Sequence, residues 1–225
     1  MAGQMVRSLR VLKVALALAI IQSAPFATAN DACRIAVLGD SLTSAYGLAV
    51  KEGFPAQLER ALRDAGHDCA VLDAGVGGDT TAGGLARLDW LLADRPSHVI
   101  VELGGNDGLR ALPPEQMEQN LDAIVSRLQA DGVTVLLAGM LAPPNLGRTY
   151  GDAFAAVFSA VAERHDVPLY PFFLDGVAGN LELTQGDGIH PTAAGIAVMV
   201  ERILPTVTRW LEQTAPASRA RPTEG

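Results

Sequence analysis

Short apolar runs alternate with longer segments of helical period along this chain, and this alternation restricts its fold more than any other feature. Strands joined by crossover helices give such a pattern. Strands that are buried on both faces are continuously apolar, as residues 99–103 and 133–138 largely are. The sequence therefore predicts an α/β fold built on a parallel sheet. The predicted strands are residues 34–38, 70–74, 99–103, 133–138 and a short one at 168–170.

Apolar residues recur at helical spacing between the predicted strands. Pro205 is expected to kink or end the last helix, because proline has no backbone N–H. The predicted architecture is a three-layer α/β/α, doubly wound sheet of about five strands in flavodoxin-like order. Ligands of such sheets bind beyond the carboxyl ends of the strands. The predicted helices pass through Met117, Leu121, Ile124, Val125 and Leu128, through Phe154, Val157, Phe158 and Val161, and through Ile196, Met199, Val200, Ile203 and Leu204.

The first 29 residues have the pattern of a secretory signal peptide. Basic residues precede the apolar run 14–21, and a small-residue cleavage site, Ala27-Thr28-Ala29, follows it. A membrane anchor is the alternative, but the apolar run is well below the roughly 20 residues that span a bilayer. We expect residues 1–29 to be cleaved from an exported protein, periplasmic or secreted, with no stable membrane anchor.

The remainder reads as a single domain over residues 30–213. A chain of this length can bury roughly 70% of its unfolded surface in one core. Residues 214–225 are rich in Pro, Ala, Ser and Arg, so we expect a disordered tail there. Residues 1–29 hold three of the 17 basic residues and none of the 25 acidic ones, so their removal takes the formal net charge from −8 to −11. That charge argues against nucleic acid and anionic lipid as partners. We expect a monomer.

The two cysteines, Cys33 and Cys69, are candidates for a disulfide. Each lies just before a predicted strand, so the two thiols start side by side if those strands are parallel neighbours. Export would place them in an oxidising compartment, where a disulfide persists. Two separately buried thiols are the alternative.

Polar motifs follow the predicted strands and would meet at one edge of the sheet. They are Asp40-Ser41, Gly77-Gly78-Asp79-Thr80, Gly104-Gly105-Asn106-Asp107, and Asp187 with His190 before the last helix. Serine is a poor nucleophile at its own pKa and needs a base, and that base needs an acid to fix its tautomer. Ser41, His190 and Asp187 match these three roles in acyl transfer.

The three-residue spacing of Asp187 and His190 places both on one local turn, with Pro191 leading into the next helix. The carboxylate can then reach one imidazole nitrogen while the other faces Ser41. In isolation, Asp187 would be a loop residue and His190 a helix cap. The serine at the end of a strand favours the catalytic interpretation.

An oxyanion needs donors that a substrate can approach, and the candidates are the amides of Ser41 and Gly78 and the side chain of Asn106. Alternatively, the Gly78 segment is a tight turn in which Asp79 caps the next helix. The segment can be such a turn and supply an oxyanion donor at the same time. Asp107 is expected to be structural.

Other kinds of site fit the sequence poorly. The glycine segment 75–80 ends in Thr where a dinucleotide fingerprint requires Gly or Ala, and the chain has no Gly-Lys-Ser/Thr triplet. The histidines are isolated and there is no Cys-x-x-Cys, so we expect no metal and no cofactor. Residue 43 is Thr, which departs from the Gly-x-Ser-x-Gly elbow of α/β-hydrolases.

These residues resemble the SGNH (GDSL) hydrolase family, whose named positions fall on Ser41, Gly78, Asn106 and His190, with the acid at Asp187. Residues 84–88, 101–110 and 167–173 resemble the bacterial periplasmic branch with thioesterase, arylesterase and lysophospholipase activity. The resemblance implies metal-free hydrolysis of acyl esters and thioesters, with the acyl chain in a groove formed by the loops 108–114 and 140–150. The expected substrate-binding residues are Gly108, Leu109, Leu141, Pro143, Pro144 and Ile189.

Two other functions remain open at this point. A carbohydrate O-acetyl esterase would use the same residues on acetyl groups of a glycan. A non-catalytic lipid- or glycan-binding protein could share the scaffold, although the intact set of Ser41, Asp187 and His190 argues against it. The apolar segment 141–146 and an aromatic content of 5% favour acyl chains over sugars.

Overall fold

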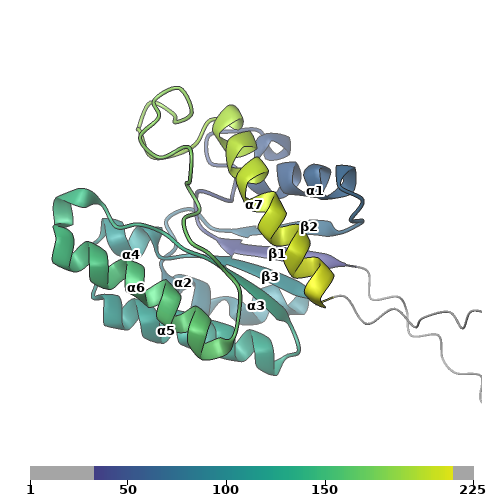
Figure 1. Ribbon diagram of the computed structural model, residues 1–225, viewed down its shortest axis with the longest axis horizontal. Helices are drawn as coiled ribbons and strands as arrows, with labels where there is room; N and C mark the ends of the chain where they lie inside the picture. Colours follow the sequence, from purple (N-terminus) through teal and green to yellow (C-terminus); the bar gives the residue numbers. More distant parts are fainter. Residues whose placement is uncertain (1–32, 215–225) are drawn as a thin grey trace, which may run out of the picture. The chain divides into compact units, whose positions relative to one another are not determined.

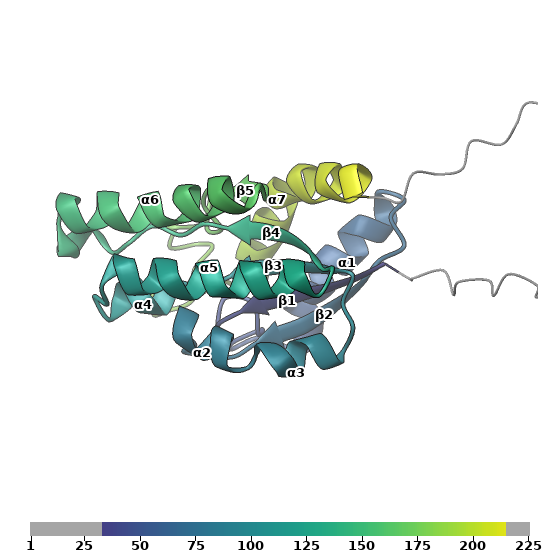
Figure 2. The ribbon, with the colours of Figure 1, turned by 90° about the horizontal axis from the view of Figure 1, so that it is seen from below.

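The computed structural model describes residues 33–214, and its centre is a five-stranded parallel sheet. The strand order is β2-β1-β3-β4-β5, so the predicted parallel α/β sheet in flavodoxin-like order is confirmed (Figures 1 and 2). Each strand begins and ends within about one residue of its predicted bounds. The strands are β1 (Arg34–Gly39), β2 (Ala70–Gly75), β3 (His98–Glu102), β4 (Thr134–Ala138) and β5 (Leu169–Tyr170).

Helices cover both faces of the sheet. Helices α1 and α7 pack against each other on one face, and α2, α3, α5 and α6 lie on the other (Figures 1 and 2). The α-helices are α1 (Phe54–Asp64), α2 (Thr81–Ala86), α3 (Leu88–Ala93), α4 (Gly105–Leu109), α5 (Pro114–Ala130), α6 (Arg148–His165) and α7 (Ala193–Thr214), with short 3₁₀ turns η1 (Val50–Glu52) and η2 (Pro144–Leu146).

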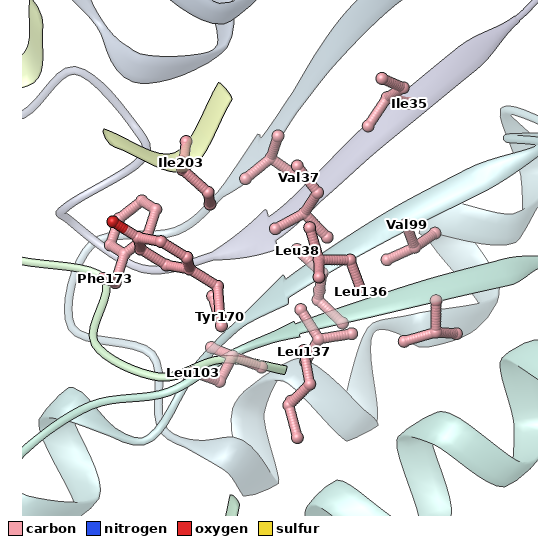
Figure 3. Close-up of a cluster of buried hydrophobic side chains, with 14 of the residues drawn as sticks. Ile35, Val37, Leu38, Val99, Leu103, Leu136, Leu137, Tyr170, Phe173 and Ile203 are labelled. Carbon is pink, nitrogen blue, oxygen red and sulfur yellow. The ribbon is translucent and has the colours of Figure 1, made fainter. Parts of the chain in front are cut away.

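The core is built from the central strands and the inner faces of the helices. Residues 35–38 of β1 are at most 1% exposed, and β3 and β4 are buried almost as completely. Figure 3 shows side chains of these strands gathered with Tyr170, Phe173 and Ile203 of the segments that pack on them. Each fully buried aliphatic side chain stabilises the fold by about 1.5–3 kcal/mol. This packing fixes the carboxyl ends of the strands, from which the candidate residues project.

The predicted disulfide between Cys33 and Cys69 is present, with the two Cα atoms 4.5 Å apart. The pairing follows from the register of β1 and β2, in which Arg34 lies opposite Ala70. The amide of Ala70 also donates to the carbonyl of Cys33 at 2.9 Å. The disulfide therefore links the starts of β1 and β2, at the end of the sheet opposite Ser41.

The structure differs from the expected bounds of helices and loops at three places. Helix α7 does not end at Pro205 but continues to Thr214, because Val207, Trp210 and Leu211 beyond it are buried in the core. Thr214 is thus the last helical residue rather than the first residue of the tail. The segment expected to be a loop at 108–114 holds the end of α4 and the start of α5, which leaves only residues 110–113 between them.

The signal peptide expected at 1–29 and the tail at 215–225 lie outside the described residues. Among the helices between residues 33 and 214, none is long and apolar enough to cross a membrane.

Candidate active site

Ser41 lies in a tight turn that begins where β1 ends. The carboxylate of Asp40 accepts the amide of Leu42 at 2.9 Å, and the carbonyl of Asp40 accepts the amide of Ser44 at 3.2 Å. These bonds close the turn around Ser41, which is partly exposed while Asp40 is buried. A Cβ atom on Gly39 would lie 2.8 Å from Oε2 of Glu102, so only glycine fits at the end of β1, directly before this turn.

His190 and Asp187 approach Ser41 from the loop before α7. Nε2 of His190 lies 2.9 Å from Oγ of Ser41, and Nδ1 lies 2.6 Å from Oδ2 of Asp187. The other carboxylate oxygen, Oδ1, accepts the amides of Ile189 and His190, each at 2.9 Å. The predicted turn geometry is thus present, and three residues that are 149 positions apart at most form one chain of hydrogen bonds.

The charge of Asp187 fixes the tautomer of His190. Hydrogen bonds from the His190 ring and from two backbone amides lower the pKa of Asp187 to about 2. An ionised carboxylate can only accept, so Nδ1 of neutral His190 carries the proton and Nε2 presents a lone pair. Nε2 can therefore accept the hydroxyl proton of Ser41.

Three donors face the space beside Ser41: the amides of Ser41 and Gly78 and the side chain of Asn106. Within residues 33–214 neither amide has a hydrogen-bond acceptor. Gly78 has φ +81°, a left-handed conformation that suits glycine. Nδ2 of Asn106 donates one of its two N–H groups to Asp40 at 2.8 Å, and the described residues offer no acceptor to the second. Converging donors of this kind can stabilise a developing oxyanion.

Sequence reasoning gave Asp40 no role, yet it holds Asn106 in place. Burial raises the pKa of Asp40 to about 6, although hydrogen bonds from Leu42 and Asn106 act in the opposite direction. Glu102, at the end of β3, is also buried, and burial followed by the charge of Asp40 raises its pKa well above the usual range. Its Oε1 has no hydrogen-bond partner in the described part of the chain. The sequence did contain a signal for Glu102, because this acidic residue lies inside the otherwise apolar run 99–103.

The turn that carries Gly78 is braced by side chains other than the expected cap. Thr80, and not Asp79, caps α2, because its hydroxyl accepts the amide of Gly83. Asp79 instead pairs with Arg87 at 2.6 Å, and Arg87 also donates to the carbonyl of Gly39 at 2.9 Å. Arg87 lies between the short helix α2, which ends at Ala86, and α3, which starts at Leu88.

Asp107 follows Asn106 in α4 and is structural in its contacts, as expected. It is 2% exposed and accepts both the amide and the hydroxyl of Thr81, at 2.9 and 2.6 Å. These two bonds join the loop that carries Gly78 to the helix that carries Asn106.

A cavity of about 380 Å³ opens beside Ser41. Of the expected substrate-binding residues, four line it: Leu109, Leu141, Pro143 and Ile189. Gly108 and Pro144 do not: Gly108 is buried against Phe154, and Pro144 is exposed on η2. Met140, at the start of the expected loop 140–150, lines it as well, and lining residues that the sequence did not suggest include Tyr46 and Leu174.

The remaining histidines lie away from this cavity. His98 begins β3 and contacts the hydroxyl of Thr214 at 3.0 Å, and His165 ends α6 beside Asp122. Within residues 33–214 no group of three or more His, Cys, Asp or Glu is arranged to hold a metal ion. A second cavity, of about 800 Å³ and lined in part by Trp210, lies near the start of β4 and contains none of the candidate residues.

Comparison with known proteins finds relatives over most of the chain. Residues 37–198 match the GDSL-like Lipase/Acylhydrolase family. Esterase TesA of Pseudomonas aeruginosa is 46% identical over 172 residues, which are 76% of this chain and 86% of that protein. Thioesterase 1/protease 1/lysophospholipase L1 of Escherichia coli K12 is 41% identical over 164 residues, 72% of this chain and 77% of that protein.

A solved structure extends the likeness to three dimensions. The psychrotrophic esterase EstA from Pseudoalteromonas, in a structure described as inhibited by monoethylphosphonate, matches with a TM-score of 0.76 at 35% identity, covering 80% of this chain and 99% of that one. The family match extends from β1 into α7 and so includes every candidate residue described above. This chain belongs to the GDSL-like lipase/acylhydrolase family, also called SGNH hydrolases.

Proposed function

We propose that this protein is an exported serine esterase that hydrolyses acyl and aryl esters and thioesters, lysophospholipids among them. The observation that carries the proposal is the chain of hydrogen bonds from Ser41 through His190 to Asp187, with lengths of 2.9 and 2.6 Å. A serine, a base and an orienting carboxylate in this geometry are the requirements of nucleophilic acyl transfer.

Acylation begins when Oγ of Ser41 attacks the carbonyl carbon of the substrate while its proton passes to Nε2 of His190. The carbonyl oxygen becomes an oxyanion that accepts hydrogen bonds from the Ser41 and Gly78 amides and from Asn106. The ionised Asp187 stabilises the imidazolium that forms. When the intermediate collapses, His190 gives the proton to the departing alkoxide or thiolate, and the acyl group stays on Ser41.

Deacylation repeats the sequence with water. His190 takes a proton from a water molecule, whose oxygen attacks the acyl carbon, and the second oxyanion uses the same three donors. Collapse returns the proton to Oγ of Ser41 and frees the carboxylic acid. No step needs a group other than the side chains, backbone amides and water.

The cavity beside Ser41 supports a substrate with an apolar acyl or aryl portion. Most of the side chains that line it are apolar, among them those of Leu42, Leu109, Met140 and Ile189. The names of the relatives support the same substrate classes, since they include esterase, arylesterase, thioesterase and lysophospholipase. A site for glycan acetyl groups would require more polar groups at the mouth.

Export is supported by the disulfide between Cys33 and Cys69, because such bonds persist in oxidising compartments and are rare in the cytosol. The basic and apolar pattern of residues 1–29 supports it as well. N-terminal sequencing of the protein recovered from the producing cells tests this part: the exported form is expected to begin at Asn30.

The catalytic proposal is tested with a fluorophosphonate probe and a panel of chromogenic esters, thioesters, lysophospholipid and acetylated sugar. The folded protein is expected to be labelled once, at Ser41, and to turn over esters and thioesters. Ser41→Ala is expected to lose both labelling and activity. Full activity in Ser41→Ala would overturn the assignment, and labelling with turnover of acetylated sugar alone would favour the O-acetyl esterase.

A further inference from the structure

Gln185 joins the loop that carries Ser41 to the loop that carries His190. Its side-chain Nε2 donates to the carbonyl of Tyr46 at 2.8 Å and to the carbonyl of Pro191 at 2.9 Å, which uses both N–H groups of the amide. Its backbone amide donates to the carbonyl of His190 at 2.6 Å. One residue therefore contacts the backbone of both loops next to the reacting groups.

The opposing loop is shaped to receive this side chain. Gly47 has φ +72°, and a Cβ atom built on it would collide with Oε1 of Gln185. Any larger residue at position 47 would both strain the backbone and displace the amide. On its own side, Gln185 lies next to a bridge between Thr184 and Pro191 and accepts the amide of Gly188 at 2.9 Å, so its backbone is fixed as well.

Few other bonds hold the two loops together. Within residues 33–214, the segments 41–49 and 181–192 share two hydrogen bonds: the one between Ser41 and His190 and the one from Gln185 to Tyr46. Most of the loop 185–189 is exposed, so core packing does little to place it. The distance between Ser41 and His190 therefore depends strongly on Gln185.

The side-chain amide of Gln185 also helps to position an aromatic ring against His190. The ring of Tyr46 packs on the imidazole with centroids 4.2 Å apart and a tilt of 31°. An aromatic face at this distance stabilises a cation, here the imidazolium that forms when Ser41 gives up its proton. Because Gln185 holds the carbonyl of Tyr46, it holds the backbone from which this ring projects.

We propose that Gln185 is a positioning residue, which keeps His190 within hydrogen-bonding distance of Ser41 and Tyr46 against the imidazole ring. This inference rests on the proposed esterase function. Without the amide, the two loops can separate, and a misplacement of about 1 Å lowers the rate of a positioned reaction by about 100-fold. The substrate cavity itself is not lined by Gln185, so binding of the acyl portion should change little.

The test compares Gln185→Ala and Gln185→Met with Gln57→Ala. Gln57 is a matched control because its Nε2 also bridges two backbone carbonyls, of Glu52 at 2.7 Å and of Ala193 at 3.0 Å. It ties α1 to the start of α7 without contacting either loop of the site. Methionine keeps the length of Gln185 but removes both donors, so it separates lost bonds from lost volume.

For each folded variant, kcat is measured per serine labelled by fluorophosphonate, together with KM and the melting temperature. Both Gln185 variants are expected to lose about ten- to 100-fold in kcat with KM within about two-fold. Gln57→Ala should lose comparable thermal stability and keep its kcat. Gln185→Met with unchanged kcat would overturn the inference, as would an equal loss in Gln57→Ala. Absence of labelling and turnover in the unsubstituted protein would instead overturn the esterase proposal.

Discussion

Asp40 and Asp187 each accept a hydrogen bond from a side-chain nitrogen of another candidate residue, but the regions that contain them are stabilised in different ways. Asp40 is buried at the end of β1 and holds the side chain of Asn106, while Asp187 has 39% of its side chain exposed and holds His190. Burial raises the pKa of Asp40 to about 6, whereas hydrogen bonds lower that of Asp187 to about 2. The pKa of the same kind of carboxyl group is thus shifted in opposite directions in the two regions.

The difference shows how each half of the site is kept in shape. The half with Gly78 and Asn106, the proposed oxyanion half, follows strand ends that the core fixes, and it contains the buried carboxyl groups of Asp40 and Glu102. The half with His190 stands on an exposed loop, and its shape depends on individual hydrogen bonds such as those of Asp187 and Gln185. Substitutions of the buried carboxyl groups should therefore change the stability of the fold, whereas substitutions in the loop with His190 should change the rate.

The largest effect is expected from Asp187→Asn. The amide would present an N–H group to Nδ1 of His190 and favour the tautomer whose Nε2 is protonated and cannot accept from Ser41. We expect kcat to fall by about 10⁴-fold, as such a tautomer change does in serine proteases, with little change in stability. Steady-state kinetics and urea unfolding measure the two effects. Asp175→Asn, an exposed loop change at an ion pair with Arg202, serves as the control and should leave kcat unchanged.

The second prediction concerns a region remote from both halves. The double variant Cys33→Ser, Cys69→Ser removes a cross-link between positions 36 residues apart. Loop-closure entropy predicts a loss of about 4 kcal/mol in the free energy of unfolding, with kcat per labelled serine unchanged. Urea unfolding of both proteins under non-reducing conditions gives the difference. A ten-fold loss of kcat would mean that the amino ends of the strands influence the site after all.

The third prediction addresses the oxyanion half directly. Asn106→Ala removes one oxyanion donor and should lower kcat by about 10²- to 10³-fold while the fold is kept. Asn120→Ala is a matched control, because Asn120 donates to the hydroxyl of Thr81 in the same region but does not line the cavity. The kinetics of both variants on one chromogenic ester decide the matter. Equal losses in the two variants would point to disturbed packing rather than a lost donor.

The smallest effect is a dependence of stability on pH. Because the pKa of Asp40 is raised from 3.8 to about 6, folding favours its protonated form. The resulting stability is fully present below pH 3.8 and is lost as the pH rises through 6, by about 3 kcal/mol at most. Asp187 has the opposite sign, since its stabilisation is lost as the pH falls through about 2.

Asp40→Asn isolates this contribution. Relative to the unsubstituted protein, the variant should gain stability as the pH rises from about 4 to 7, as measured by urea unfolding at each pH. Glu102 has the same sign as Asp40, so Glu102→Gln, measured in parallel, shows how much of the slope each buried carboxyl supplies. A constant difference between Asp40→Asn and the unsubstituted protein across this range would contradict the raised pKa.

Residues that carry chemistry by their own type could be predicted from the sequence. Ser41, Gly78, Asn106, Asp187 and His190 follow strands or precede the last helix, and the rule for parallel sheets places such segments at one edge. The central strands were equally predictable, because strands buried on both faces are mostly apolar, and Glu102 in β3 is the acidic exception. In the structure, hydrogen bonds join Ser41, His190 and Asp187, and Gly78 and Asn106 line the same cavity as Ser41 and His190.

Residues that act through another residue were not predictable. Asp40 and Gln185 have common residue types in turn-forming segments, and their partners lie 66 and 139 positions away in the chain. Local propensity also misplaced the cap of α2 and the end of α7, because an ion pair took Asp79 and burial of Trp210 kept the helix beyond Pro205. In each case a tertiary contact outweighed the local preference.

The contact between His98 and Thr214 has a practical consequence. It places the last helical residue of α7 at the amino end of β3, beside the start of β1 and the disulfide. Both ends of the described chain therefore leave the sheet at the edge away from Ser41. A linker that joins position 33 to position 214, or a surface to which the enzyme is tethered by either end, leaves the mouth of the cavity open to substrate.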